Sequence, residues 1–317
     1  MANFGTVLFT FIFMIPVLAS TTDSDFLVGR HQLEEMQRIS KETVLIESRN
    51  MQLKIYPQKT SCVAVVIHGL FQSPKDMQGL IDYFYNQGCN VVAPLLAAHW
   101  HKDDEIFYKI NYKTWLNQIS EVLSASEKLG KKIILVGHSA GSLLALDQII
   151  NNVNKYNISH AILFAPAIKL KTFVILSTKI GSIFKWNENF MSVISKNVDH
   201  EYDQQIRPAI AGVHVQNLIE SIFGQSLNSR SAAYMNIHVP ILIVSTENDA
   251  TVDHVEILKL KNYRPQFIKL ISYPKESLIQ HDNIQRSIID VPPGSPNSWF
   301  NSKYKELLEQ ITNFLNH

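Results

Sequence analysis

Residues 137–141, Gly-His-Ser-Ala-Gly, match the pattern G-x-S-x-G, which places a serine between two glycines. The preceding segment, Lys132–Val136, is an apolar run that predicts a buried strand, and Ala140–Asn151 predicts a helix. On a sharp turn from strand to helix, the serine hydroxyl is exposed at the end of the sheet. We therefore interpret Ser139 as a nucleophile; the alternative is a glycine-flanked turn without chemistry.

The candidate acid lies later in the chain. A serine hydroxyl is a weak nucleophile near neutral pH and requires a base that a carboxylate orients. Asp249 comes shortly after the predicted strand Val239–Val244, at the carboxyl end, where parallel sheets place their sites. We assign Asp249 as the acid. Asp253 and Glu247 compete with it, but Asp253 lies further along and is expected to start the next helix.

The candidate base is His281, in a polar loop after the last predicted strand, Gln266–Ser272. The resulting order of nucleophile, acid and base suits a triad built at the end of such a sheet. Two other late histidines compete: His254 is too close in sequence to the acid, and His317 is the terminal residue. The alternative for His281 is a solvated loop histidine.

Acyl transfer also needs hydrogen-bond donors aimed at the oxygen that becomes negative in the transition state. One donor is expected to be the backbone N–H of Ala140, directly after the nucleophile. The second is expected at Leu70, in the loop after the apolar strand Cys62–Ile67. Phe71 and His138, which neighbour the predicted catalytic groups in sequence, are the candidate substrate-binding residues.

The elements that position these residues alternate between strands and helices, which predicts a mostly parallel, doubly wound α/β sheet. Further strands are expected at Glu42–Glu47, Met51–Tyr56, Asn90–Pro94 and His160–Phe164. Further helices are expected at Asp25–Ile39, Tyr112–Leu129 and Ser302–Leu315.

An insert of about residues 170–236 is too long for an ordinary connection between two strands. Helical patterns near Thr172–Phe184 and Ala209–Phe223 predict a helical cap over one edge of the sheet. Its apolar positions could line an acyl pocket or form the cap's own core, and its lysines and apolar residues would also suit transient contact with a membrane surface. These positions are Phe173, Val174, Leu176, Ile180, Ile183, Phe184, Phe190 and Met191.

The first 20 residues carry no charged side chain, and the apolar run from Phe4 to Ala19 ends in small residues after Pro16. This pattern is typical of a signal peptide, although no Lys or Arg precedes the run. We expect residues 1–20 to be removed and residues 21–317 to form one domain that includes the insert at about residues 170–236, exported to the periplasm or secreted. A membrane anchor formed by an uncleaved N-terminal segment is the alternative.

Export would place the chain in an oxidising compartment. The two cysteines, Cys62 and Cys89, are too few for a disulfide scaffold, and each begins a predicted strand. Because a disulfide between neighbouring strands strains the geometry, we expect two buried free thiols.

Composition excludes several other classes of protein. The chain has 317 residues, of which 46% are hydrophobic, so it can bury a large core. Its formal net charge of +1 provides no basic surface for a nucleic acid. Residues 99–104, His-Trp-His-Lys-Asp-Asp, partly match a binuclear metal motif, but Asp104 replaces its final histidine. We therefore expect a polar loop there and no metal site.

Several stretches of the chain resemble the α/β-hydrolase superfamily and are most similar to its monoacylglycerol-lipase and small-carboxylesterase group. They span about Ser61–Ile288 and read VVIHGLFQSPKDMQGLIDYF, NVVAPLLAAHWHKDD, KKIILVGHSAGSLLALDQI, ILFAPAI, VPILIVSTENDATVD and LIQHDNI. The resemblance implies an α/β-hydrolase fold with an inserted helical cap. It also implies a triad and two oxyanion amides, at Ser139, Asp249, His281, Leu70 and Ala140.

The activity that this resemblance implies is hydrolysis of a small-molecule or lipid ester, such as an acylglycerol or a lysophospholipid. It would proceed through an acyl-enzyme, with no metal or cofactor. Where the family usually has G-H-G, this chain has Ala98-His99-Trp100, so we expect a bulkier pocket wall there. An acyl-thioesterase, a serine peptidase and a non-catalytic hydrolase-like binding protein remain alternatives, and the oligomeric state stays open.

Overall fold

The computed structural model describes residues 23–103, 105–152, 154–183 and 207–316. The predicted signal peptide, residues 1–20, lies outside these ranges. Within them, no helix combines the length and the apolar character needed to cross a membrane.

The described chain forms one seven-stranded sheet in the order β1-β3-β2-β4-β5-β6-β7. Strand β1 pairs with β3 in the antiparallel sense, and all the other pairs are parallel, as the sequence predicts. The strands are β1 (Gln52–Lys54), β2 (Val63–Ile67), β3 (Asn90–Ala93), β4 (Ile133–His138), β5 (Ile158–Phe164), β6 (Ile241–Thr246) and β7 (Ile268–Tyr273).

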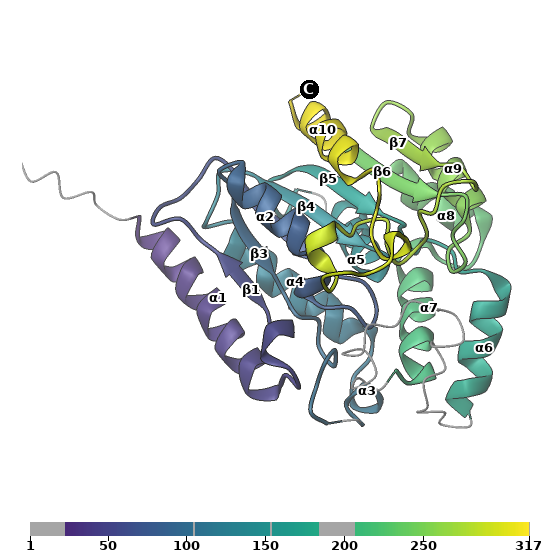
Figure 1. Ribbon diagram of the computed structural model, residues 1–317, viewed down its shortest axis with the longest axis horizontal. Coiled ribbons are helices and arrows are strands. Elements are labelled where there is room, and N and C mark those ends of the chain that lie inside the picture. The colour runs from purple at the N-terminus through teal and green to yellow at the C-terminus, as the bar shows by residue number, and fades with distance from the viewer. Residues whose placement is uncertain (1–22, 104, 153, 184–206, 317) are drawn as a thin grey trace, which may run out of the picture.

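Helices cover both faces of this sheet (Figure 1). The main ones are α1 (Ser24–Thr43), α2 (Gln78–Asn86), α3 (Ile106–Lys109), α4 (Tyr112–Ser126), α5 (Ala140–Asn151), α6 (Thr172–Ile183), α7 (Ala209–Phe223), α8 (Leu227–Met235), α9 (His254–Tyr263) and α10 (Tyr304–Leu315). Helices α1, α4, α5 and α9 contribute to one buried apolar cluster, and α2 and α10 contribute to the other. The two clusters lie on opposite faces of the sheet.

The central strands are buried on both faces because their sequences are continuous apolar runs. In β2, Val63, Val65 and Ile67 join the cluster of α4 and α5, whereas Ala64 and Val66 join that of α2 and α10. This alternation is the two-residue repeat of a strand. Because β2 and β4 are packed on both faces, the loops at their carboxyl ends begin from firmly packed strands.

The predicted strand at Glu42–Glu47 is wrong. Helix α1 continues past Glu42, and Glu47–Arg49 is a short 3-10 turn. Arg38 forms ion pairs with Glu35, at 2.6 Å, and with Glu42, which stand three and four residues away from it. Because such spacings bring side chains together on one helical face, these pairs favour the longer helix.

The insert between β5 and β6 contains α6, α7 and α8, and α6 and α7 lie side by side (Figure 1). A Cβ built on Gly212 would lie 2.2 Å from Cγ2 of Thr178, so only glycine lets α7 approach α6 this closely. The sequence did not predict α8, which begins at a capping box between Ser226 and Ser229. The predicted apolar positions Phe184, Phe190 and Met191 lie outside the described residues.

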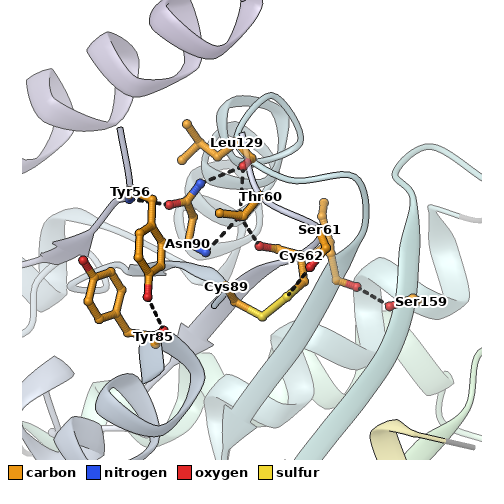
Figure 2. The surroundings of a disulfide bond; sticks show 10 residues. Tyr56, Thr60, Ser61, Cys62, Tyr85, Cys89, Asn90, Leu129 and Ser159 are labelled. Atoms are coloured by element: carbon orange, nitrogen blue, oxygen red, sulfur yellow. Dashed lines mark hydrogen bonds between the residues drawn. A yellow bond between two sulfur atoms is a disulfide. The ribbon is translucent and has the colours of Figure 1, made fainter. Parts of the chain in front are cut away.

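Cys62 and Cys89 form a disulfide bond (Figure 2), so the expectation of free thiols is wrong. Their Cα atoms are 4.8 Å apart, a separation that a disulfide accommodates. The cysteines immediately precede Val63 and Asn90, the first paired residues of β2 and β3, so the bridge forms at the rim of the sheet. The Asn90 side chain donates to the carbonyl of Leu129 nearby and helps to hold this rim together.

Candidate active site

Ser139 lies on a strained turn between the end of β4 and the start of α5. Its φ of 51° and ψ of −113° are an uncommon conformation for a residue other than glycine. A Cβ on Gly141 would lie 2.1 Å from the carbonyl oxygen of Ile67, and one on Gly137 would lie 2.6 Å from the Cα of Ser142. Only glycines therefore fit on either side of the serine, which is the arrangement that the G-x-S-x-G pattern predicts.

Three predicted residues meet at the carboxyl end of the sheet. The Nε2 of His281 lies 2.9 Å from the hydroxyl oxygen of Ser139, and its Nδ1 lies 2.7 Å from Oδ2 of Asp249. A carboxylate accepts from Nδ1–H, so Nε2 carries the lone pair and can accept the serine proton. The three side chains form a continuous relay from hydroxyl to carboxylate.

The carboxylate of Asp249 and the protonated imidazole of His281 stabilise each other. Burial alone would lower the pKa of His281, but the Asp249 carboxylate outweighs it and raises that pKa above its usual value. Burial would raise the pKa of Asp249, but His281 and the N–H groups of Val252 and Thr251 lower it overall. These two N–H groups donate to Oδ1 at 2.7 and 2.8 Å. Asp249 therefore stays ionised beside the imidazole.

The competing acid and base have other partners in the structure. Asp253 is the N-cap of α9, accepts from the N–H of Val255 and forms an ion pair with Lys169 at 2.7 Å. His254 is the first residue of the same helix, and its Nε2 lies 3.4 Å from the hydroxyl of Ser272. Neither contacts Ser139.

The predicted oxyanion donors lie beside the serine. Leu70 and Ala140 line the same cavity as Ser139, and no described residue accepts a hydrogen bond from either backbone N–H. Gln72, which the sequence analysis missed, holds the loop of Leu70, because its Oε1 accepts from the N–H of Gly69 at 3.0 Å. Phe71 adopts a positive φ of 61° in this loop and is buried at the cavity wall.

Both ring nitrogens of His138, the second predicted substrate-binding residue, face other groups of the protein. Its Nδ1 lies 2.7 Å from Oε1 of Gln72, and its Nε2 lies 2.9 Å from the backbone carbonyl oxygen of His281. Burial holds the pKa of His138 well below its usual value, so the ring is neutral. The ring borders the cavity but is only 1% exposed, and it connects the nucleophile turn to the loop of the base.

A cavity opens onto Ser139 and has about 1050 Å³ of space, including its open mouth. It lies between the sheet and the insert, since both contribute to its walls. Its apolar lining includes Leu70, Phe71, Ala167, Leu170, Val174 and Val215. Of the insert positions singled out from the sequence, Val174 lines the cavity, whereas Phe173 and Leu176 are 51% and 58% exposed.

The segment Ala98-His99-Trp100 does not line this cavity, so the expected bulkier wall is absent among the described residues. His99 is buried beside the rings of Phe107 and Trp115, and Trp100 packs under the guanidinium of Arg49. These residues therefore belong to the core. In the described ranges, no three His, Cys, Asp or Glu side chains are grouped as metal ligands would be.

Two buried arginines at the cavity were not identified from the sequence. Arg207 precedes α7, and Arg286 follows His281 by five residues. The Nη2 of Arg286 donates to Asp76 at 2.9 Å, and Asp76 in turn accepts from the fully buried Arg49 at 2.9 Å. The ion pair of Asp76 with Arg286 could not be predicted from local sequence, because the two residues lie 210 positions apart.

Comparisons with known proteins agree with this arrangement. The sequence profile of the family Hydrolase_4, described as serine aminopeptidase, S33, matches residues 58–266. The match includes Ser139 and Asp249 and ends before His281. The comparison with curated proteins finds no match.

Solved structures with the same fold are distant in sequence. A soluble variant of monoglyceride lipase from Saccharomyces cerevisiae, in complex with a substrate analog, superposes with a TM-score of 0.63 at 13% identity, over 84% of this chain and 91% of that one. Est1E from Butyrivibrio proteoclasticus, bound to ferulic acid, gives 0.56 at 16% identity, over 84% and 93%. A structure of the metagenome-derived lipolytic enzymes LipS and LipT gives 0.60 at 13% identity, over 86% and 100%. At these sequence identities, the structural similarity shows a shared fold.

Proposed function

Because the chain belongs to the α/β-hydrolase family described as serine aminopeptidase, S33, we propose that it is a serine hydrolase that cleaves carboxylic esters. The observation that carries this proposal is the relay of Ser139, His281 and Asp249, with contacts of 2.9 and 2.7 Å, at the mouth of a largely apolar cavity. A hydroxyl, a neutral imidazole and a carboxylate in this order make a nucleophile from an otherwise unreactive alcohol.

The reaction would proceed in two halves. In the first, the Oγ of Ser139 attacks the ester carbonyl carbon while Nε2 of His281 takes the hydroxyl proton. The C–O bond to the leaving alcohol then breaks, and His281 returns the proton to that alcohol. In the second half, water attacks the acyl carbon while His281 takes a proton from the water. The bond from the acyl carbon to Oγ of Ser139 then breaks, His281 returns the proton to Oγ, and the acid product leaves. Asp249 stabilises the imidazolium in both halves.

The negative oxygen of each tetrahedral intermediate would bind the N–H groups of Leu70 and Ala140. Both donors border the cavity beside Ser139, and no described residue accepts from them. Preorganised donors of this kind contribute about 3–4 kcal/mol each to the transition state. Ala140 is also the first residue of α5, so the positive end of the helix dipole adds to the effect.

The apolar cavity favours a small-molecule or lipid ester, with acylglycerols and lysophospholipids as the first substrates to test. Phe71 supports an acyl group at the wall of the cavity. His138 serves the substrate indirectly, because its two ring nitrogens face Gln72 and His281. Helices α6 and α7 form the cap side of the cavity through Val174 and Val215.

An aminopeptidase is the second candidate, because the matching family carries that description. Its substrates present a positive amino terminus near the scissile bond. Among the described residues of the lining, Asp282 is the acidic side chain that could pair with an ammonium group, and two arginines line the same cavity. Assaying aminoacyl p-nitroanilides beside p-nitrophenyl acyl esters separates the two activities.

Labelling with a fluorophosphonate probe tests the proposal directly, since the probe forms a bond only with an activated serine oxygen. The native chain should be labelled and should cleave p-nitrophenyl butyrate, and Ser139→Ala should do neither. Ser124→Ala, at an exposed position on α4, is the matched control and should behave like the native chain. Retained ester cleavage in Ser139→Ala would overturn the assignment, and an unlabelled, inactive native chain would indicate a binding protein.

We further propose that the chain is exported after removal of residues 1–20. The apolar segment from Phe4 to Ala19 supports this, and the disulfide of Cys62 and Cys89 suits an oxidising compartment. Fractionation of an expressing host and the N-terminal sequence of the recovered protein test the proposal. A start near residue 21 in the exported fraction is expected, whereas an intact N-terminus in the membrane fraction would favour the anchored alternative.

A further inference from the structure

The proposed catalytic acid lies in a loop beyond the end of its strand. Strand β6 ends at Thr246, and Asp249 follows three residues later. Asn248 and Ala250, on either side of Asp249, are exposed, so packing against the core does not hold these two residues. The carboxylate must nevertheless stay within hydrogen-bond distance of Nδ1 of His281, because the relay depends on that contact. Contacts from another part of the chain therefore have to hold this loop in place.

The segment at which the insert begins, residues 169–171, lies against the loop of the acid. It comes directly before α6, and it pairs with residues 251–253, which come shortly after Asp249. Three main-chain contacts join the two segments, namely the antiparallel bridge between Leu170 and Val252 and two hydrogen bonds of 2.9 Å, from the N–H of Asp253 to Lys169 and from the N–H of Lys171 to Thr251. The start of the insert thus pairs with the acid loop as an extended segment.

The side chain of Lys171 adds a contact to the acid itself. Lys171 is half-buried, and its Nζ donates to the backbone carbonyl oxygen of Asp249. The N–H groups of Thr251 and Val252 in turn donate to Oδ1 of Asp249, at 2.8 and 2.7 Å. Lys171 therefore holds the main chain at Asp249 and at Thr251, which are the two ends of the turn whose N–H groups orient the carboxylate.

Lys171 is also bonded to the first turn of α6. Its backbone carbonyl oxygen accepts from the N–H of Val174 at 3.0 Å and from that of Ile175 at 3.2 Å. Val174 lines the cavity that opens onto Ser139, whereas Lys171 is not among the described residues of that lining. A single residue outside the cavity wall therefore connects a helix of the insert with the loop of the acid.

We propose that Lys171 is a positioning residue for ester hydrolysis, and that the insert completes the relay by holding Asp249 in place through it. This inference rests on the proposed esterase function. Hydrogen bonds from a charged donor are stronger than those between neutral groups, so the ammonium fixes the carbonyl of Asp249 well. Without it, the carboxylate would be freer to leave Nδ1 of His281, and a small displacement of a catalytic group is enough to slow the reaction.

Single variants measure the effect on a short ester, p-nitrophenyl acetate, which keeps contacts with the insert to a minimum. Lys171→Met removes the ammonium and should lower kcat by at least about tenfold while KM changes by less than about twofold. Lys171→Arg keeps a charged donor and should recover most of kcat. Lys169→Met is the matched control, because it removes an ammonium from the same segment, where Lys169 pairs with Asp253 at 2.7 Å. Its kcat should stay near the native value.

A double variant tests whether Lys171 acts through the acid. In an Asp249→Asn background there is no carboxylate to position, so adding Lys171→Met should cost less than about twofold in kcat. A residue that only supports the fold would cost the same factor in both backgrounds. The rates are corrected for those of Ser139→Ala, and circular dichroism checks the folding of each variant. If Lys171→Met fails to fold, Lys171→Gln, which removes the charge but keeps a polar side chain, takes its place in both comparisons.

Three results would overturn this role of Lys171. They are a native kcat in Lys171→Met, an equal loss in the native and Asp249→Asn backgrounds, and a loss in Lys169→Met as large as that in Lys171→Met. In each case fluorophosphonate labelling and Ser139-dependent ester cleavage by the native chain would leave the proposed function intact. If the native chain is neither labelled nor active on any ester, the proposed function itself fails, and the positioning role fails with it.

Discussion

The Nε2 of His138 lies 2.9 Å from the backbone carbonyl oxygen of His281, so the residue beside the nucleophile contacts the main chain of the base. The other ring nitrogen lies 2.7 Å from the side chain of Gln72, whose amide oxygen accepts from the N–H of Gly69. A Cβ on Gly69 would lie 2.7 Å from the His138 ring, so the three loops are closely packed here. His138 thus acts as a positioning residue for the site.

Replacing His138 by alanine should lower kcat, because the loop of His281 loses a hydrogen bond that fixes its distance from Ser139. Misplacing a catalytic group by about 1 Å can cost about 10²-fold in rate. His138→Gln, which can still donate to the carbonyl of His281, should recover most of the activity. The measurement is kcat and KM for a p-nitrophenyl ester, with circular dichroism as a check on folding. Equal losses in the two variants would mean that the ring serves packing alone.

Asp249→Asn should change the pH dependence of the reaction. The base works when neutral, so kcat/KM of the native enzyme rises with pH through the pKa of His281, which Asp249 raises above its usual value of 6.5. Without the carboxylate charge, that rise should move to lower pH. The maximal rate should also fall by about 10⁴-fold, since the amide no longer selects the working tautomer. A pH–rate profile with an unmoved acid limb would contradict the assignment of Asp249.

Removing the disulfide should reduce stability and spare activity. Cys62 and Cys89 are 27 residues apart in sequence, and closing a loop of this size is worth about 3–4 kcal/mol in the chain-entropy treatment. The double variant Cys62→Ala/Cys89→Ala should lose about that much free energy of unfolding in urea. Its kcat should stay near the native value, because the bridge precedes β2 and β3 while Ser139 follows β4. The reduced native protein is the control and should unfold like the variant; identical unfolding midpoints of oxidised protein and variant would refute the prediction.

Asp290 should make the protein less stable as the pH rises from about 4 to about 7. Burial raises the pKa of its carboxyl to about 7, although the backbone N–H groups of Ser287 and Gly79 donate to it. The folded chain therefore binds a proton that the unfolded chain releases near pH 4, and this contribution to stability is lost as the pH passes 7.

The variant Asp290→Asn cannot titrate, so its stability relative to the native protein should improve by more than about 1 kcal/mol between pH 5 and pH 8. A tenfold difference in proton affinity is worth about 1.4 kcal/mol, which sets the scale. Thermal or urea unfolding of both proteins at the two pH values provides the measurement. Parallel stability curves for the two proteins would show that Asp290 is not the group involved.

The sheet and the nucleophile turn could be predicted from the sequence because their signals are local. Val63–Ile67 and Ile133–His138 are apolar runs, and Gly137 and Gly141 stand where a Cβ would strike backbone atoms. The first helix was predicted too short and a strand was placed at Glu42–Glu47, since a short mixed segment carries a weak periodic signal.

The disulfide was missed for a different reason. Cys62 and Cys89 can bond because β2 and β3 pair in a register that places Val63 opposite Asn90. A shift of this register by one residue would separate the cysteines, and the apolar pattern of the sequence does not determine the register. Helix α8 was missed because its nine residues are too few and too polar to show a clear apolar repeat.

The sequence by itself determined the order of the elements and identified the serine, the aspartate and the histidine of the site. Each of these three residues follows a strand that is recognisable from its apolar run. Only the tertiary structure brought Ser139 to His281 across 142 residues and His281 to Asp249 across 32. It alone placed Arg207 and Arg286 at the cavity. Arginines are usually exposed, and their burial is decided by long-range partners such as Asp76, which local sequence does not encode.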